Sequence, residues 1–199
     1  MAVPADVTAD GYEIQFGTSH MGNFTLMRLL LPIMLRTAAQ PESDVRFVAL
    51  TSLGYALHPK GGIQFDLVRS KQEDKNTWAK YGQSKLANIL TAKEMARRHP
   101  SITSVVLHPG TVKTGLVDNL SWVNRMFVHV TNPMGLMTVQ QGACNMLWAS
   151  TTQKSNLKPG QFYLPVGKPG DLLRDGENME LAKTLWDWSE KEIAELNLG

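Results

Sequence analysis

This sequence of 199 residues has very little cysteine and almost no excess charge of either sign. Its single cysteine, Cys144, excludes an internal disulfide framework and a zinc site built from several cysteines. Twenty basic residues stand against eighteen acidic ones, so a net charge of +2 gives no electrostatic case for a nucleic acid as partner. These absences favour a reducing compartment, and we expect the protein to be cytoplasmic.

Long apolar runs and leader segments are also missing. The first residues have neither the basic nor the apolar region of a signal peptide. The most apolar stretch, residues 26–35, is shorter than the ~20 residues a bilayer span needs, and Arg28 and Pro32 interrupt it. We therefore expect no membrane span. The histidines show no metal-ligand spacing such as H-E-x-x-H, so we expect no metal.

The composition indicates one folded domain, because 43% of the residues are apolar and 19% are charged. Apolar residues at helical spacing predict helices over residues 8–37 (capped by Thr8 or Asp10), 77–98, 133–149 and 179–196. Mostly apolar runs predict short strands, buried on both faces, over residues 46–50, 102–107 and 160–164. This alternation is typical of an α/β fold with a parallel sheet, although three strands make a thin one.

The segment Tyr81-Gly82-Gln83-Ser84-Lys85 carries the first pattern with chemical meaning. Four residues apart in a helix, Tyr81 and Lys85 share one face. An ammonium group that close favours the phenolate and lowers the tyrosine pKa, so that Tyr81 could exchange a proton with a substrate oxygen. For the pair alone, the alternative is a solvated lysine beside a tyrosine that packs in the core.

Two further segments follow predicted strands. Ser52 comes after the first strand, and Pro109–Thr114 after the second. Open α/β sheets bind ligands at the carboxyl ends of their strands. The Ser52 hydroxyl could donate to the same substrate oxygen, while Thr114 and the backbone of Val112 could contact an amide or a phosphate. The alternatives are a strand-end cap and an ordinary strand-to-helix turn.

Together these segments resemble the short-chain dehydrogenase/reductase family, and within it the retinol-dehydrogenase-like branch. The resemblance runs in order from about residue 1 to residue 196. The segments that carry it are similar to the family's central helix, serine-bearing strand, active-site helix and nicotinamide turn: Thr8–Glu13 with Gly17–Gly22, Phe47–Ser52, Tyr81–Asn88 and His108–Thr114.

This resemblance implies hydride transfer between a nicotinamide and a substrate carbon. Tyr81 would then be the proton donor or acceptor, and Ser52 would orient the substrate oxygen. Lys85 would lower the Tyr81 pKa and hold the nicotinamide ribose. Val112 and Thr114 would contact the carboxamide or the cofactor phosphate. Family habit alone favours NADP over NAD.

The sequence departs from the family in two places. It contains no G-x-G-x-x-G or related glycine turn. It therefore resembles the C-terminal half of a Rossmann-type doubly wound parallel sheet, a single partial domain over residues 1–199 that lacks about 80–100 residues of the N-terminal glycine-rich unit. Ser19 stands where the family usually has an asparagine that anchors a water relay, and Asn23 lies one turn further on.

The substrate we expect is a lipophilic small molecule. An apolar flap over it could be formed by Leu116, Leu120, Trp122, Met126, Phe127 and Met134, although core packing explains them as well. An unpaired edge on the 46–50 strand predicts a homodimer or a partner-dependent chain. Two other hypotheses stay open: a catalytically silent remnant that acts as an interaction module, and an incomplete gene model with the rest of the enzyme upstream.

Overall fold

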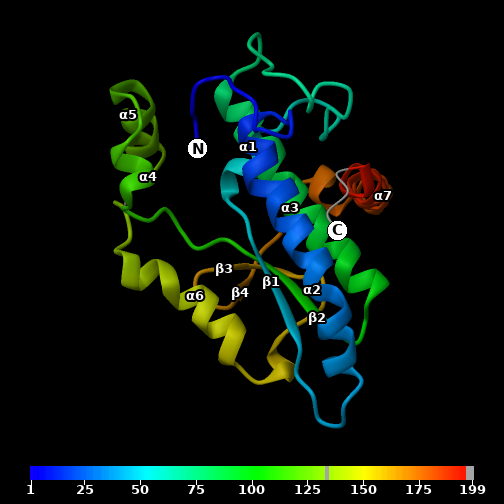
Figure 1. The fold of residues 1–199 in the computed structure, drawn as a ribbon. Coiled ribbons are helices and arrows are strands. Elements are labelled where there is room, and N and C mark those ends of the chain that lie inside the picture. Colours follow the sequence, from blue (N-terminus) through cyan, green and yellow to red (C-terminus); the bar gives the residue numbers. More distant parts are fainter. Residues whose placement is uncertain (133–134, 196–199) are drawn as a thin grey trace.

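A four-stranded sheet forms the centre of the computed structural model, which describes residues 1–132 and 135–195 (Figure 1). The strands lie in the order β1 (Arg46–Leu50), β2 (Thr103–Leu107), β3 (Phe162–Leu164) and β4 (Lys168–Pro169). The first three are parallel and β4 is antiparallel to β3. The predicted α/β fold with a mostly parallel sheet is confirmed. Strand β4 was not predicted, because two exposed residues carry no periodic pattern.

Helices cover both faces of this sheet. A continuous N-terminal helix comprises α1 (Ile14–Phe16), a π-helical turn η1 (Gly17–Met21) and α2 (Gly22–Ala38). The other α-helices are α3 (Thr77–Arg98), α4 (Gly115–Asp118), α5 (Trp122–Thr131), α6 (Val139–Thr151) and α7 (Met179–Glu195), with 3-10 turns η2 (Leu53–Leu57), η3 (Lys154–Asn156) and η4 (Arg174–Glu177). Among the described helices none combines the length and the apolarity that crossing a membrane requires.

The start of the first helix differs from the prediction. Glu13, not Thr8 or Asp10, is its N-cap, and Glu13 Oε2 accepts hydrogen bonds from the backbone N–H groups of Gln15 (3.1 Å) and Phe16 (2.8 Å). Thr8 is instead occupied in a preceding turn, where its hydroxyl accepts from the Tyr12 N–H. A local side-chain bond therefore moved the helix start by several residues.

The core has two layers, one on each face of the sheet. Alternation along β2 points Val106 toward α3, where it packs with Leu86 and Leu90, while Val105 and Leu107 pack against α6 residues such as Ala149. All of these side chains are fully buried. This alternation fixes the helices on both faces, as in a doubly wound sheet.

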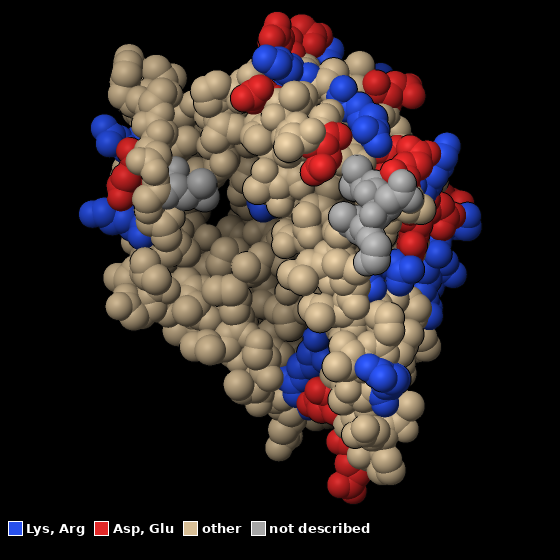
Figure 2. All heavy atoms as spheres, viewed as in Figure 1, with Lys and Arg blue, Asp and Glu red and all other residues tan. Residues whose placement is uncertain are grey.

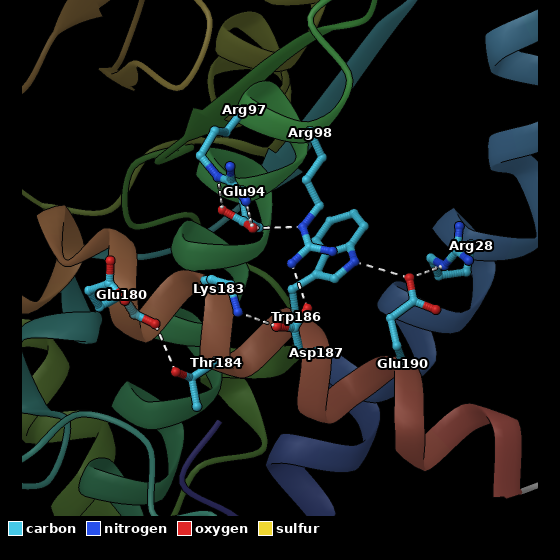
Figure 3. Close-up of polar contacts among 10 residues, drawn as sticks. All are labelled: Arg28, Glu94, Arg97, Arg98, Glu180, Lys183, Thr184, Trp186, Asp187 and Glu190. Carbon is cyan, nitrogen blue, oxygen red and sulfur yellow. Dashed lines mark hydrogen bonds and ion pairs between the residues drawn. The ribbon is translucent and has the colours of Figure 1, made fainter.

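A polar network holds α7 against α3 and α2 on the outer side of the molecule (Figure 3). The fully buried Glu94 of α3 pairs with Arg97 and Arg98, and Arg98 also reaches Asp187 of α7 (2.5 Å). A second link joins Arg28 of α2 to Glu190 of α7 (2.6 Å). Several charges share partners here, so the network contributes more than isolated surface pairs would.

Candidate active site

Helix α3 is fixed on the carboxyl end of β1 by two side-chain hydrogen bonds. The Thr51 hydroxyl donates to the carbonyl oxygen of Lys85 (2.8 Å), and the Asn88 amide donates to that of Leu50 (2.9 Å). The start of α3 is capped by Asn76, whose side chain accepts from the Trp78 N–H (2.7 Å). These bonds set the rotation of α3, and with it the direction in which Tyr81 points.

Two glycines let the backbone after β1 lie directly on α3. A Cβ at Gly82 would stand 2.6 Å from the His58 nitrogen and 2.9 Å from the Gly54 carbonyl oxygen. A Cβ at Gly54 would stand 2.8 Å from Cε1 of Tyr81. Only glycine permits this approach. It brings Ser52, which caps η2 by accepting from the Gly54 N–H (3.1 Å), next to the Tyr81 ring.

A pocket of about 340 Å³ opens at the carboxyl ends of β1 and β2. Ser52, Tyr81, Val112 and Thr114 all line it, so the structure brings together four of the residues singled out in the sequence. Lys85 does not line this pocket. It faces a groove of about 490 Å³ beside the open edge of β1, with its Nζ over the Tyr81 ring, 5.5 Å from the ring centroid.

The electrostatics of the pair differ from the expectation. Burial raises the pKa of Tyr81 above its usual value, and a hydrogen bond with Ser52 opposes that rise only in part. Burial likewise lowers the pKa of Lys85. The predicted lowering of the tyrosine pKa by Lys85 is therefore wrong for this structure, because desolvation of the Tyr81 phenol outweighs the Ser52 hydrogen bond and Lys85 does not lower the pKa. Near neutral pH, Tyr81 is a protonated phenol able to donate a proton.

The loop after β2 is held in place around Val112. Gly110 has φ +87°, a left-handed conformation that glycine adopts without strain. Val112 pairs with Met137 in a short β-bridge, and Gly142 of α6 leaves so little room that a Cβ there would stand 2.3 Å from the Val112 side chain. Thr114 is the N-cap of α4 without a capping bond from its side chain, so its hydroxyl is available to a ligand.

His108 is a pocket residue that the sequence analysis did not single out, although it begins the segment that resembles the nicotinamide turn. It is 7% exposed, lines the pocket, and has a buried Nδ1 with no partner among the described residues. Burial lowers its pKa to about 4, so the ring is neutral near neutral pH. Its backbone carbonyl accepts from Asn145 of α6 (2.9 Å). The only signal in the sequence was its place before Pro109-Gly110 at a strand end.

The central helix gives no substitute for the missing asparagine. Ser19 lies half-buried in η1, and the Asn23 side-chain amide donates to the Ser19 carbonyl oxygen (2.8 Å). His20 is buried beside them and its Nε2 lies 2.9 Å from the Ser189 hydroxyl. Asn23 is therefore engaged within its own helix. Within residues 1–132 and 135–195 no three His, Cys, Asp or Glu side chains are grouped to share a metal ion.

The predicted apolar flap forms only in part. Leu120 is buried with Val117 and Val128, and Phe127 packs on Trp78, but Trp122 (69% exposed) and Met126 (54% exposed) face solvent. Met134 and the side chain of Leu116 lie outside the described residues. Figure 2 shows a deep hollow between the α4–α5 arm and the body, lined almost wholly by uncharged residues, while charges gather on the opposite side.

Comparison with known proteins gives a consistent set of relatives, although no family model matches the chain. A short-chain dehydrogenase/reductase of Armillaria gallica is 32% identical over 94% of this chain and 59% of its own length. A short-chain dehydrogenase/reductase of Aspergillus calidoustus is 30% identical over the whole chain and 67% of its own length. Human retinol dehydrogenase 14 is 32% identical over 92% of the chain and 53% of its own length.

Solved structures agree in fold. An uncharacterized protein from Mycobacterium paratuberculosis superposes with a TM-score of 0.68 at 27% identity, over 96% of this chain and 63% of that one. The carbonyl reductase Sniffer of D. melanogaster gives a TM-score of 0.54 at 17% identity, which supports the fold alone. The chain thus spans roughly three fifths of the length of the relatives it matches.

Proposed function

Because this chain belongs to the short-chain dehydrogenase/reductase family, we propose that it carries the catalytic half of an NAD(P)-dependent oxidoreductase. The reaction would interconvert a lipophilic alcohol and its ketone or aldehyde. The observation that carries the proposal is the meeting of Ser52 and Tyr81 with the Val112–Thr114 loop in one pocket at the strand ends.

The residues present fit the nicotinamide end of the cofactor and not its other end. Val112 and Thr114 offer backbone groups and a free hydroxyl at the pocket, as a carboxamide requires. The sequence has no glycine turn to hold a pyrophosphate at a helix N-terminus. When bound, the nicotinamide would supply or accept the hydride. NADP is our choice over NAD, on family habit alone.

The chain's own residues would move the proton and hold the substrate. Tyr81, kept protonated by burial, donates its phenolic proton to the substrate oxygen in the reductive direction and takes it back in the other. Ser52 donates a second hydrogen bond to that oxygen and so orients the carbonyl. Lys85, close to the Tyr81 ring, would hold the ribose and favour the phenolate once the proton has left.

The lining supports a lipophilic substrate. Besides the polar groups, the pocket is lined by apolar side chains that include Val117, Val139 and Met146. The hollow beside it is nearly free of charged residues (Figure 2). A mostly apolar site with few polar groups suits a ligand with one reacting oxygen. The name of one relative, retinol dehydrogenase 14, adds retinal to the compounds worth testing.

A rival function is a catalytically silent interaction module. The observation that favours it is the open edge of β1, which offers backbone groups to a second strand. We propose for either function that the chain is a homodimer or needs a partner. We also place it in the cytoplasm, on the strength of a single, exposed and unpaired Cys144.

Turnover separates these two functions. Purified protein, incubated with NADPH or NADH and a panel of aliphatic aldehydes, ketones and retinal, should consume reduced cofactor. Tyr81→Phe should lower the rate by about 100-fold or more, because it removes the proton donor. Tyr163→Phe, which removes a buried hydroxyl on β3 outside the pocket, is the matched control and should retain its rate. Near-normal turnover by Tyr81→Phe would contradict the mechanism.

Cofactor affinity provides a second test. Most dinucleotide affinity in such folds comes from the glycine turn that this sequence lacks. Calorimetry of the chain should therefore detect weak binding at best, and Lys85→Ala should weaken it further. Micromolar binding that survives Lys85→Ala would place the cofactor elsewhere.

A further inference from the structure

Residues 114–132, called the flap below, form an arm that contains α4 and α5 and stands away from the sheet (Figure 1). The arm is closed at its base by a backbone ladder. The Met137 N–H donates to the Thr111 carbonyl (2.8 Å), and the Lys113 N–H donates to the Met137 carbonyl (2.9 Å). This base fixes where the flap begins and ends, but it does not fix how closely α5 lies against α3.

Trp78, in the first turn of α3, makes the contact that sets this distance. Its indole Nε1–H donates to Oδ1 of Asn124 on α5 (3.0 Å). Its ring packs on Phe127, with the ring centroids 5.1 Å apart. It also packs against the small buried cluster of Val117, Leu120 and Val128 inside the flap. Among the described residues, no other hydrogen bond joins α5 to α3.

The same indole contacts the proposed proton donor. The rings of Trp78 and Tyr81 meet edge to face, with centroids 6.0 Å apart and an interplanar angle of 89°. The two residues lie three apart on α3, so they occupy one face of the helix. Asn76 caps the helix at the Trp78 N–H and thus holds the indole in register with Tyr81.

The outer face of α5 offers the flap no second attachment. Besides Phe127, which is 41% exposed, four of its apolar side chains are exposed: Trp122, Val123, Met126 and Val130. Besides Trp78, the flap is held by Met1 and Ala2, which pack on its buried cluster, and by the Thr111 hydroxyl, which donates to Asn132 (2.6 Å). A helix with so few attachments is at the weak end of local stability and can open without unfolding the sheet.

We propose that Trp78 is a positioning residue that latches α5 to α3 beside the pocket and holds the Tyr81 ring against the pocket wall. With the latch closed, water is excluded from the phenol and the substrate is confined. With the Trp78–Asn124 bond broken, α5 moves outward and a lipophilic substrate can enter. The catalytic part of this inference rests on the proposed function, whereas the latch itself does not.

Hydrogen exchange of the full chain tests the latch without any activity. Trp78→Phe keeps an aromatic ring and removes the donor, and it should speed exchange of the α5 amides about two- to tenfold, as expected for one lost hydrogen bond. Asn124→Leu removes the acceptor and should speed exchange of the α5 amides to the same extent as Trp78→Phe. Trp122→Leu, an equal loss of indole from the exposed face of α5, is the control and should leave these rates unchanged.

Titration of the Tyr81 phenol tests the second contact. Trp78→Leu removes the indole that shields Tyr81 and should lower its pKa, because burial is what raises it. The signal is assigned by its loss in Tyr81→Phe, and Trp122→Leu should leave it in place. Should Trp78→Leu fail to fold, Trp78→Phe and Asn124→Leu still decide the question through α5 exchange.

Unchanged α5 exchange in both Trp78→Phe and Asn124→Leu would overturn the latch. A rise in exchange over the whole chain would overturn it too, since it would reveal a general structural role. Where turnover is measurable, Trp78→Phe should raise KM for the lipophilic substrate several-fold more than it lowers kcat. A wild-type chain without turnover would reject the proposed function and leave the exchange result to stand alone.

Discussion

Strands β1 and β2 have the same length and similar apolar sequences, and they pair in parallel from Arg46↔Thr103 to Leu50↔Leu107. Their environments nevertheless differ. Every residue of β2 is buried, whereas only Ala49 of β1 is, and Leu50 is 40% exposed. The reason is position, because β2 lies between β1 and β3 while β1 is the edge. The burial of a strand is therefore a property of its neighbours as much as of its residues.

The parts of the candidate site that follow β1 and β2 differ in the same way. The β2 side is complete within the chain: Asn145 holds His108, and Met137 holds the loop at Val112. The β1 side opens on the groove that Lys85 lines with α2 side chains such as Phe24 and Met27. Tyr81 thus sits in a formed pocket, while Lys85 faces the open side.

The largest difference in stability between the two strands is expected when a charge is placed, in separate variants, on each residue of one cross-strand pair. Val48 of β1 lies opposite Val105 of β2. Val105→Asp buries an unpaired carboxylate at a site with no exposure and should lower the free energy of unfolding by more than about 4 kcal/mol. Val48→Asp, at the half-exposed strand, should cost under about 2 kcal/mol. Denaturant unfolding of both variants measures the difference, and equal losses would show that the edge is covered in solution.

Much of the fold was readable from local pattern. The bounds of β1 and α3 were predicted to the residue, because their apolar runs and periods are unambiguous. The apolar pattern alone predicted β1 to be buried on both faces, and only the resemblance predicted that one of its edges would be unpaired. The helix predicted over 133–149 begins at Val139 in the structure, because Thr138 and Gln141 form a capping box there.

Acidification should lower the stability of the protein through His108, which directly follows β2. Burial holds the pKa of His108 at about 4, against 6.5 for the free side chain. Below about pH 6.5, His108 therefore binds a proton in the unfolded chain but not in the folded one, and stability is lost as the pH falls toward 4. Each unit of pKa shift corresponds to about 1.4 kcal/mol, so the free energy of unfolding should fall by about 3 kcal/mol.

Unfolding measured across this pH range tests the assignment. His108→Gln should flatten the loss, whereas His129→Gln, at an exposed position of α5, should not. A profile that is the same in wild type and His108→Gln would mean that another group carries the acid sensitivity. The buried His20, whose pKa burial lowers to about 3, contributes in the same direction and stays in both variants.

The close packing of the segment after β1 on helix α3 can be tested by adding a single Cβ atom. Gly82→Ala forces a Cβ to within 2.6–2.9 Å of backbone atoms in Gly54, Leu57 and His58, so it should cost about 2 kcal/mol and displace Ser52 from Tyr81. Gly22→Ala on α2 meets nothing closer than 3.7 Å, and should stabilise the helix by up to about 1 kcal/mol. Thermal unfolding that ranks the two variants the other way would contradict the packing.

The candidate site could be proposed from the sequence only where its residues follow a local pattern. Tyr81 and Lys85 stand at a fixed helical spacing, and Ser52 and Val112 stand at strand ends, so pattern and resemblance found them. Trp78 escaped notice because its role depends on Phe127 and Asn124, far along the chain. The pKa of Tyr81 could not be read either, since it follows from burial in three dimensions.

The smallest expected change in stability concerns the open edge itself. The Thr51 N–H donates to Leu107, and the Thr103 N–H donates to Val45, so the odd-numbered residues of β1 bond to β2 and Val48 directs its N–H outward. Val48→Pro removes that donor and no ladder bond, and should cost about 1 kcal/mol. Val105→Pro, which breaks the ladder, is the control for folding. If strand pairing drives association, light scattering should find wild type dimeric or larger and Val48→Pro shifted toward monomer, whereas an unchanged assembly would place the contact on another surface.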